Sequence, residues 1–322
     1  MRGFSGAAVY RCGRTIRWIR PVAGLALPLA ALVACQGPMA PLPGPAPGAA
    51  APAVDRETEA ASAYYAKVQA NYLASGRMRR DGGGPDTPFD ARTLAANFER
   101  VAFFDEFAER GGKLVPGGPE QVLHRWTVPI RMQIDFGPSV PPATQLRDRA
   151  LVAAYLARLS HLSGLPAHMV DADPNYLVLV EGPSERRAAR DRILGFAPQT
   201  SRGALDSALH MTPDIYCTVF SYSEGASPVY TSALAVIRSE LPDQMREMCY
   251  HEELSQGLGL VNDSPQARPS IFNDDEEFAL LTRQDALMLR MLYDRRLRPG
   301  MTLDEARPII KTIVAELLPD QS

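Results

Sequence analysis

The segment Cys249–Asp263 (CYHEELSQGLGLVND) decides how the rest of the chain is interpreted. Pro242 precedes this segment and is a residue that commonly opens a helix. A helix is therefore predicted from Pro242 to about Gly257, with a stop at Gly259, because glycine is the residue most often found just past a helix end. We call residues 242–257 the motif helix.

One face of the motif helix is unusual. At about 100° per residue, several side chains fall within a narrow arc, which is shared by Met245, Met248, Cys249, Glu252, Gln256 and Gly259. Leu254 and Leu258 lie on the opposite side, so the helix is predicted to be buried on both sides. A buried carboxylate is costly unless it is paired, hydrogen-bonded or bound to a metal. Glu252 therefore needs a partner.

The pair His251-Glu252 suggests a zinc peptidase, but the zinc motif HExxH needs a second histidine four residues later, where Ser255 stands. A shift of one residue gives the spacing of the longer metzincin pattern HExxHxxGxxHD. The histidines of that pattern are then replaced by Glu252, Gln256 and Asn262. The position of the general base is taken by Glu253.

Three interpretations of this set remain open. A hard divalent cation such as Ca²⁺ or Mg²⁺ suits oxygen ligands from Glu252, Gln256, Asn262 and Asp263. Zinc is disfavoured, because neutral amides are poor zinc ligands. A metal-free hydrogen-bond network is the third. His251 could act as an acid or base, although a lone histidine beside a buried helix is more often structural.

Outside the motif helix, the sequence pattern predicts an α+β fold with a mixed β-sheet backed by helices and a helical C-terminal part. Strands are expected at 126–134, 176–180, 217–222 and 229–237. Pro129 suggests an edge position for the first of them. Helices are expected at 147–163 and after the capping boxes Thr282–Asp285 and Thr302–Glu305. Helical spacing also marks 54–75 and 90–110, and a loop is expected at 111–119. We therefore expect a helical accessory region at 54–120 and the main domain at 121–322.

Residues 1–34 have the composition of a signal peptide, with five arginines followed by the uncharged stretch Val22–Ala34. Thirteen apolar residues are too few for a membrane-spanning helix. The tetrapeptide Leu32–Cys35 resembles the lipobox of bacterial lipoproteins, which predicts lipidation at Cys35. Gln36 favours sorting to the outer membrane. The proline-rich stretch 35–53 is predicted to be a tether that holds the domain off the membrane, facing the periplasm.

The charge of the remaining chain argues against nucleic acid as a partner. From Cys35 onward, 29 basic residues stand against 37 acidic ones, a net charge of −8, which repels phosphate on average. The acidic run Asp274–Glu277 could bind cations, although such a run is usually a solvated loop. Asn273 and Asp274 are better candidates for contacting the motif helix.

Cys217 and Cys249 are the two remaining cysteines after Cys35. An even pair in an oxidising compartment predicts a disulfide, which would connect a strand to the motif helix.

Three stretches of the chain are distinctive: Glu252–Ser264, Ser270–Thr302, and Arg125-Trp126 with Pro129. In these stretches the chain resembles the proteobacterial lipoprotein family catalogued as domain of unknown function 2927. The resemblance implies a zincin-like fold but supplies no activity. Two functions are expected. One is a lipid-anchored envelope protein with a degenerate metallopeptidase-like domain that binds peptide or envelope protein. The other is a metal-dependent hydrolase with Glu253 as general base and oxygen ligands.

Overall fold

A six-stranded sheet organises the protein in a computed structural model that describes residues 56–319. Its strands follow the order β3-β8-β6-β4-β5, and β7 pairs with β8. All pairs in this sheet are parallel except β7 with β8, which are antiparallel. The strands are β3 (Arg125–Trp126), β4 (Ile130–Phe136), β5 (Ala167–Met169), β6 (Tyr176–Glu181), β7 (Cys217–Ser223) and β8 (Val229–Arg238).

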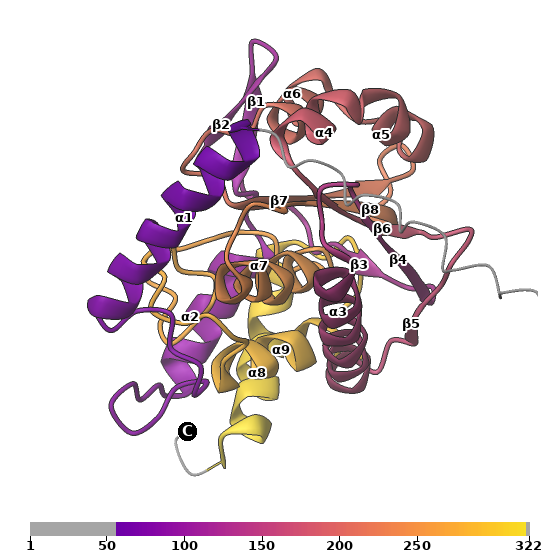
Figure 1. Cartoon of the computed structure of the whole chain (residues 1–322). Helices are drawn as coiled ribbons and strands as arrows, with labels where there is room; N and C mark the ends of the chain where they lie inside the picture. Colours follow the sequence, from indigo (N-terminus) through magenta and orange to yellow (C-terminus); the bar gives the residue numbers. More distant parts are fainter. Residues whose placement is uncertain (1–55, 320–322) are drawn as a thin grey trace, which may run out of the picture. The chain divides into compact units, whose positions relative to one another are not determined.

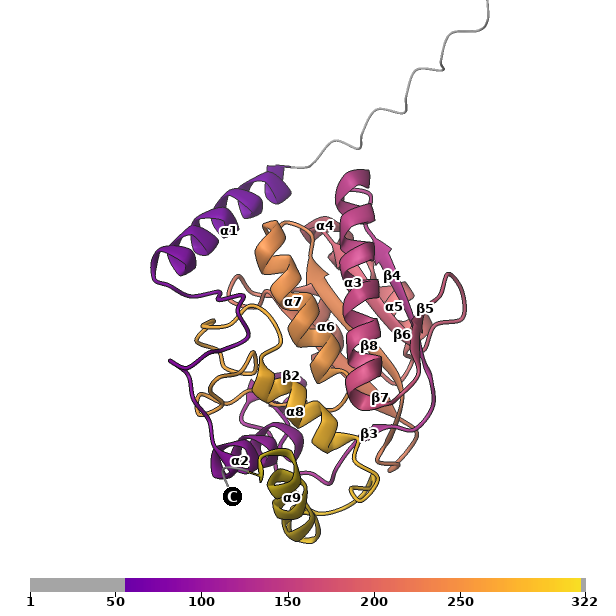
Figure 2. The same cartoon turned by 90° about the horizontal axis from the view of Figure 1, so that it is seen from below.

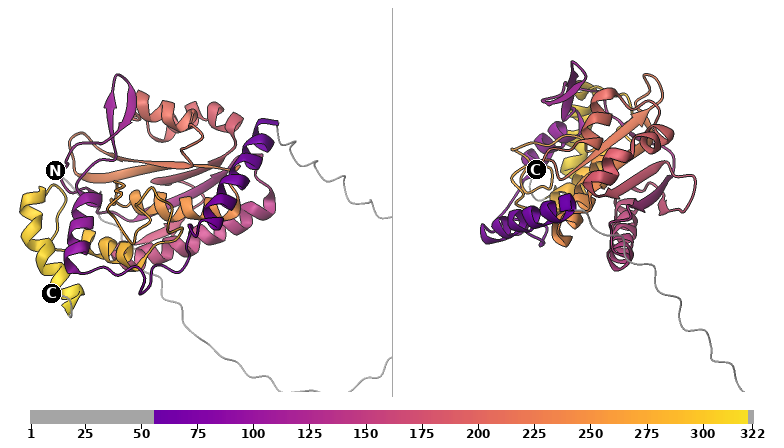
Figure 3. Two further views of the ribbon diagram at one scale, coloured as in Figure 1. Left: turned by 90° about the vertical axis from the view of Figure 1, so that its left-hand side faces the viewer. Right: turned by 45° about the horizontal axis from the view of Figure 1, so that its top comes forward.

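Helices cover both faces of the sheet, as Figure 1 and the left view of Figure 3 show. One face carries α4 (Pro183–Ala188), α5 (Arg190–Phe196) and α6 (Arg202–Leu209). The other carries α3 (Pro142–Ser163) and α7 (Asp243–Gln256), which lie side by side in Figure 2, followed by α8 (Arg283–Leu292) and α9 (Leu303–Leu317). Strand β6 shows why both faces are covered. Leu177 and Leu179 pack under α5 and α6, whereas Tyr176, Val178 and Val180 belong to the core beneath α7.

The predicted α+β fold class is confirmed, and the helix boundaries near the motif agree well. Helix α7 begins directly after Pro242, and its C-cap is Gly257. Both predicted capping boxes are present, with Thr282 and Thr302 each accepting from the backbone N–H three residues on.

The helical pattern over 90–110 and the loop expected over 111–119 are wrong in part. Helix α2 (Ala91–Ala102) ends early, and β1 (Phe107–Arg110) pairs with β2 (Lys113–Pro116) as a hairpin. Gly111 and Gly112 have φ of 60° and 74°, which is the conformation a two-residue hairpin turn requires. Upstream, α1 (Arg56–Ala74) agrees with its prediction, and Leu94, Phe98 and Val101 of α2 share the main core.

The expected edge position near Pro129 is also wrong. The predicted strand is divided into β3 and β4 on either side of Pro129, and β4 has β5 and β6 as neighbours. Because Pro129 stands just before β4, its missing N–H leaves the ladder intact.

No helix within residues 56–319 is both long and apolar enough to cross a bilayer. The signal peptide expected at 1–34, Cys35 and the tether at 35–53 lie outside the described residues.

Candidate functional site

Four aromatic side chains position the C-terminal end of α7. Hydroxyl and indole groups of neighbouring elements donate to backbone carbonyls in the last two turns of α7 and in the two residues that follow it. The bonds run from Trp126 Nε1 to Gly257 O (2.8 Å), Tyr176 Oη to Glu253 O (2.8 Å), Tyr155 Oη to His251 O (2.9 Å) and Tyr293 Oη to Leu258 O (2.9 Å). The sheet and two other helices therefore fix where the side chains of α7 point.

Two glycines make this close packing feasible. A Cβ on Gly257 would lie 2.1 Å from the Tyr176 hydroxyl oxygen. Gly259 has φ of +121°, and a Cβ there would lie 2.7 Å from the His124 carbonyl oxygen. Glycine is therefore required at both positions, and the chain turns sharply after α7 toward Asn262 and Asp263.

A cavity of about 350 Å³ opens between α7, β7, the β1–β2 hairpin and the loop that follows α7. We call it the acidic cleft, because eight carboxyl groups line it. The basic side chains among the described residues that line it are those of Lys113 and His210. The eight are Glu106, Asp206, Asp214, Glu252, Glu253, Asp263, Asp274 and Glu276. A neighbouring cavity of about 650 Å³ shares several of these residues, so the hollow continues past the hairpin.

Exposure falls from the rim of the acidic cleft to its floor. Asp274 is exposed, Glu252 and Asp263 are half-buried, and Glu253 is 4% exposed. Gln256 donates through Nε2 to both Asp263 oxygens, at 3.1 and 3.2 Å. Glu253 Oε2 is buried and has no hydrogen-bond partner among the described residues. A buried carboxylate oxygen without a partner is costly, so this atom marks where a ligand group would be stabilised.

Burial and mutual repulsion raise the pKa of the carboxyl groups in the acidic cleft. Burial raises the pKa of Glu252 and Glu253 well above the ordinary 4.5, and the nearby Asp263 raises both further. The pKa of Asp263 rises to about 8 through burial and Asp274, and burial raises the pKa of Glu276 to about 7. The pKa of Glu106 rises to about 10 for the same reasons. Positive charge entering the cleft would relieve this repulsion.

These pKa values predict how stability depends on pH. In the unfolded chain the Glu253 carboxyl loses its proton near pH 4.5, whereas in the folded protein it keeps that proton to a higher pH. The free energy of unfolding therefore falls as pH rises above about 4.5. Replacing Glu253 with glutamine should make the fall in the free energy of unfolding with rising pH shallower above about pH 4.5, because the glutamine side chain does not titrate. The measurement is urea unfolding at several pH values in chelator-treated samples. The prediction fails if Glu253→Gln has the wild-type slope. Glu247→Gln, on the same helix but outside the cleft, should retain that slope.

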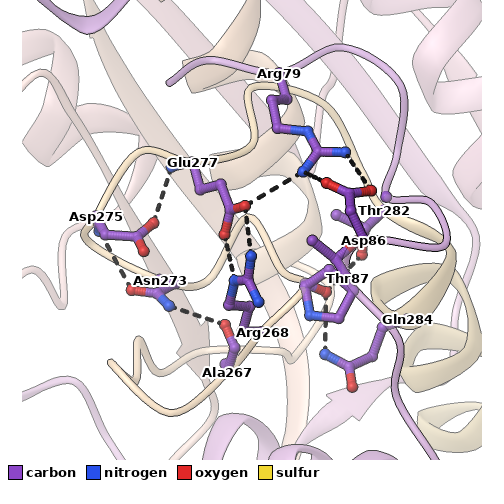
Figure 4. A network of polar contacts seen from close by, with 12 residues as sticks. Arg79, Asp86, Thr87, Ala267, Arg268, Asn273, Asp275, Glu277, Thr282 and Gln284 are labelled. Carbon is purple, nitrogen blue, oxygen red and sulfur yellow. Dashed lines mark hydrogen bonds and ion pairs between the residues drawn. The ribbon is translucent and has the colours of Figure 1, made fainter. Parts of the chain in front are cut away.

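An ion-pair network holds the loop that supplies Asp274 and Glu276. Figure 4 shows Glu277 between two arginines: Arg79 Nη1 lies 3.3 Å from Glu277 Oε1 and Arg268 Nε 2.6 Å from Glu277 Oε2. The backbone is tied as well, since the Met78 N–H donates to the Glu276 carbonyl at 2.7 Å. The acidic run therefore has two roles: Glu277 anchors the loop, and Asp274 and Glu276 face the cleft.

Glu252, Glu253, Gln256 and Asp263 come together in the cleft, but Asn262 does not join them. The Asn262 Nδ2 donates to the Arg100 carbonyl at 2.9 Å. Neutral amides are poor zinc ligands, and Asn262 does not join the others, so the three positions that hold zinc in the metzincin pattern do not fit a zinc ion here.

His251 lies away from the cleft lining. Its Nδ1 accepts from the Leu281 N–H at 3.0 Å, and its ring stacks on Tyr155 with centroids 3.9 Å apart. Burial lowers the pKa of His251 to about 3, so the imidazole is neutral. These contacts indicate a structural role for His251, which connects α7 to the segment just before α8.

The disulfide between Cys217 and Cys249 is confirmed. It links the first residue of β7 to the middle of α7, which are two walls of the cleft. Glu106, Asp206, Asp214 and Glu276 were not predicted as site residues. Glu276 could have been found from the acidic run, but nothing in the sequence places the other three near α7.

A family model described as "Protein of unknown function (DUF2927)" matches residues 91–312, which is more than two thirds of the chain. No curated protein and no solved structure shows significant similarity.

Proposed function

Because the chain belongs to the DUF2927 family, whose function is unknown, we propose a function from the site itself. The acidic cleft binds an extended, positively charged segment of a peptide or envelope protein and does not cleave it. One observation supports this proposal. Eight carboxyl groups line a single cavity, whereas two basic side chains among the described residues, Lys113 and His210, line it. Positive charge that enters the cleft favours the ionised form of these carboxyl groups, and the ionised groups attract cations and repel anions.

The shape of the site favours an extended segment. Strand β7 pairs with β8 on one side, and no strand among residues 56–319 pairs with its other edge. Cys217, Thr218 and Val219 of β7 line the cleft. A polypeptide can add to such an edge through backbone hydrogen bonds, while alternate side chains reach adjacent pockets. Lysine or arginine side chains would then meet the carboxyl groups of the cleft.

The residues at the zinc positions of the metzincin pattern support binding without cleavage. Neutral amides stand at two of the three zinc positions, and the Asn262 amide is directed to the Arg100 carbonyl, so these residues do not form the three-imidazole arrangement that activates water in metzincins. The motif spacing together with the glycine turn after α7 supports kinship with zincins, which we include in the proposal.

A peptide titration tests the function. A fluorescent peptide that alternates lysine and valine should bind, and its affinity should fall as salt is raised. The double variant Asp274→Asn/Glu276→Gln removes two rim charges and should weaken binding about tenfold, at roughly 0.7 kcal/mol per charge. Fluorescence anisotropy measures both effects.

The matched control makes the same change of charge elsewhere. Asp191→Asn/Asp304→Asn alters two exposed acids on α5 and α9, outside the cleft, and should bind the peptide as the wild type does. Equal weakening in both double variants would show that only overall charge matters. Equal affinity for a peptide with glutamate in place of lysine would reject the proposal.

The second candidate function is metal-dependent hydrolysis with Glu253 as general base. It is favoured by the buried Oε2 of Glu253, which has no hydrogen-bond partner in the part of the chain that the structure describes, and Glu253 stands at the position that a general base occupies in the metzincin pattern. This function predicts that peptides incubated with protein and a divalent cation are cleaved, and that Glu253→Gln abolishes the cleavage. Mass spectrometry of the peptides decides between the two functions.

We also propose that the protein is anchored in the bacterial cell envelope through a lipid on Cys35, facing the periplasm from the outer membrane. The apolar stretch before Cys35 and the lipobox-like tetrapeptide support this location. The acidic cleft would then be held near the membrane by a tether of about twenty residues.

Replacing Cys35 with alanine tests the anchor. The wild-type protein should be in the membrane fraction of cells, and Cys35→Ala should move it to the soluble periplasmic fraction, because two acyl chains or more hold a protein stably on a bilayer whereas none holds it. Immunoblots of fractionated cells measure this. Unchanged membrane association of Cys35→Ala would refute lipidation at this residue.

A further inference from the structure

We propose that the floor of the acidic cleft is a binding site for a hard divalent cation of the Ca²⁺ type, held by carboxylate oxygens of Glu106, Glu252, Glu253 and Asp263. This set differs from the three zinc positions of the metzincin pattern, because Gln256 and Asn262 are not ligands in it. Three members, Glu106, Glu253 and Asp263, come from positions that the pattern does not assign to the metal.

The spacing of the two adjacent glutamates fits one ion. A carboxylate oxygen of Glu252, one of Glu253 and the Cys217 sulfur all lie within 4.8 Å of one another. Oxygens that bind one Ca²⁺ at about 2.3 to 2.6 Å can be at most about 5 Å apart. The Cys217 sulfur is in the disulfide with Cys249 and cannot act as a thiolate ligand. These two oxygens define the site. Glu106 and Asp263 line the same cavity, but among the described residues no third carboxylate oxygen lies within 4.8 Å of both, so the Glu106 and Asp263 side chains have to turn toward the ion when it binds.

The buried oxygen of Glu253 supplies the independent reason to expect an ion. Glu253 is 4% exposed and its Oε2 lacks a hydrogen-bond partner within residues 56–319. Two other buried carboxylates pair with arginine, Asp148 with Arg246 and Glu240 with Arg186, and the buried Asp285 accepts from hydroxyl and backbone donors instead. Within the described part of the chain, no such pair is formed by Glu253. A cation from solution would take the place that arginine takes in the other two cases.

The donor set selects the kind of ion. Four carboxylates and no imidazole or thiolate favour a hard cation over zinc or copper. Mg²⁺ usually keeps several waters and uses one or two carboxylates, whereas Ca²⁺ accepts six to eight oxygens in variable geometry. The proposed ligands come from three segments: the residue before β1, α7 and the turn after α7. Such a set favours Ca²⁺, which accepts an irregular arrangement of ligands. Gln256 holds Asp263 through both carboxylate oxygens, which keep lone pairs for a metal.

The proposed ion site and the proposed peptide site lie in different parts of the cleft. The peptide is expected to contact the rim, at the exposed Asp274 and the half-buried Glu276, and the edge of β7. The ion is expected at the floor. A protein that binds Ca²⁺ but no basic peptide would support the metal site and reject the proposed function, and the reverse result would do the opposite.

Calorimetric titration with CaCl₂ tests the site in the purified, chelator-treated protein. We expect one ion per chain and a rise in melting temperature on binding. Glu253→Gln and, separately, Glu106→Gln should each weaken Ca²⁺ binding at least about tenfold, because each removes a charged ligand. Glu106→Gln removes its ligand from a different segment, so it tests the site even if Glu253→Gln fails to fold.

Two variants outside the cleft serve as controls. Glu247→Gln changes α7 outside the cleft, and Glu109→Gln changes an exposed glutamate of β1, so both should bind Ca²⁺ as the wild type does. The proposal is overturned if the wild type shows neither heat nor thermal stabilisation at millimolar CaCl₂. It is also overturned if Glu106→Gln and Glu109→Gln bind Ca²⁺ with the same affinity as the wild type.

Discussion

Replacing Asp148 with alanine should lower the free energy of unfolding by about 3 to 5 kcal/mol, because it leaves a buried cation without its main partner. Asp148 is 1% exposed and lies on α3, where its carboxylate accepts from Arg246 Nε and from the Tyr250 hydroxyl at 3.0 Å. Arg246 is 3% exposed and belongs to α7. The pair therefore joins α3 to α7, and urea denaturation measures its loss.

Asp243 provides a matched control for this prediction. It accepts from the same arginine, at 2.9 Å from Arg246 Nη2, but its side chain is 64% exposed. Because exposed ion pairs contribute little, Asp243→Ala should cost less than about 1 kcal/mol. Similar losses in both variants would contradict the assignment of Asp148 as the essential partner.

Removing the disulfide is the second large effect that we expect. The double variant Cys217→Ala/Cys249→Ala frees a loop whose ends are 32 residues apart, which should lower the free energy of unfolding by about 3 to 4 kcal/mol. Chemical denaturation of the variant against the oxidised wild type measures the difference. Because the bond joins β7 to α7, the variant should also bind the basic peptide more weakly.

Reduction of the wild type is the control for the double variant. Wild-type protein treated with a reductant should lose stability by about the same amount, since the same constraint is removed without any change of side chain. If the reduced wild type and the double variant are both as stable as the oxidised protein, the disulfide contributes nothing to stability. The contribution of the loop constraint would then be refuted.

The elements around the motif could be predicted from the sequence because their signals are local. Pro242 and Gly257 mark the ends of α7, and threonine with an acidic residue three positions later marks the starts of α8 and α9. The disulfide was predictable because only two cysteines follow Cys35. In each case, one or a few neighbouring residues hold the information.

The β1–β2 hairpin could not be predicted in the same way. Phe104 and Phe107 continue the apolar spacing of α2, so the helical pattern extends to residue 110 when the sequence is considered without tertiary context. Residues 107–116 instead form a short hairpin packed beside α6, and Gly111 with Gly112 is the local clue to its turn. This hairpin lies just after Glu106. Because the hairpin was not predicted, the residues that line this side of the cleft were not predicted either.

The candidate site was predictable only in the part that belongs to one segment. Glu252, Glu253, Gln256 and Asp263 are close in sequence and meet in the structure. Asn262 has the right spacing but bonds to α2, because spacing does not determine side-chain direction outside a helix. Other carboxyl groups of the cleft reach it from segments up to about 150 residues away, and a single sequence contains no information on such contacts.

Hydrogen exchange of the β7 amides on addition of the basic peptide tests the central claim most directly, because it reports both whether the acidic cleft is occupied and where. The account predicts that exchange slows at residues 217–223 when the lysine–valine peptide is added and remains unchanged with the glutamate peptide. Binding of the lysine–valine peptide with unchanged exchange throughout 217–223 would contradict it.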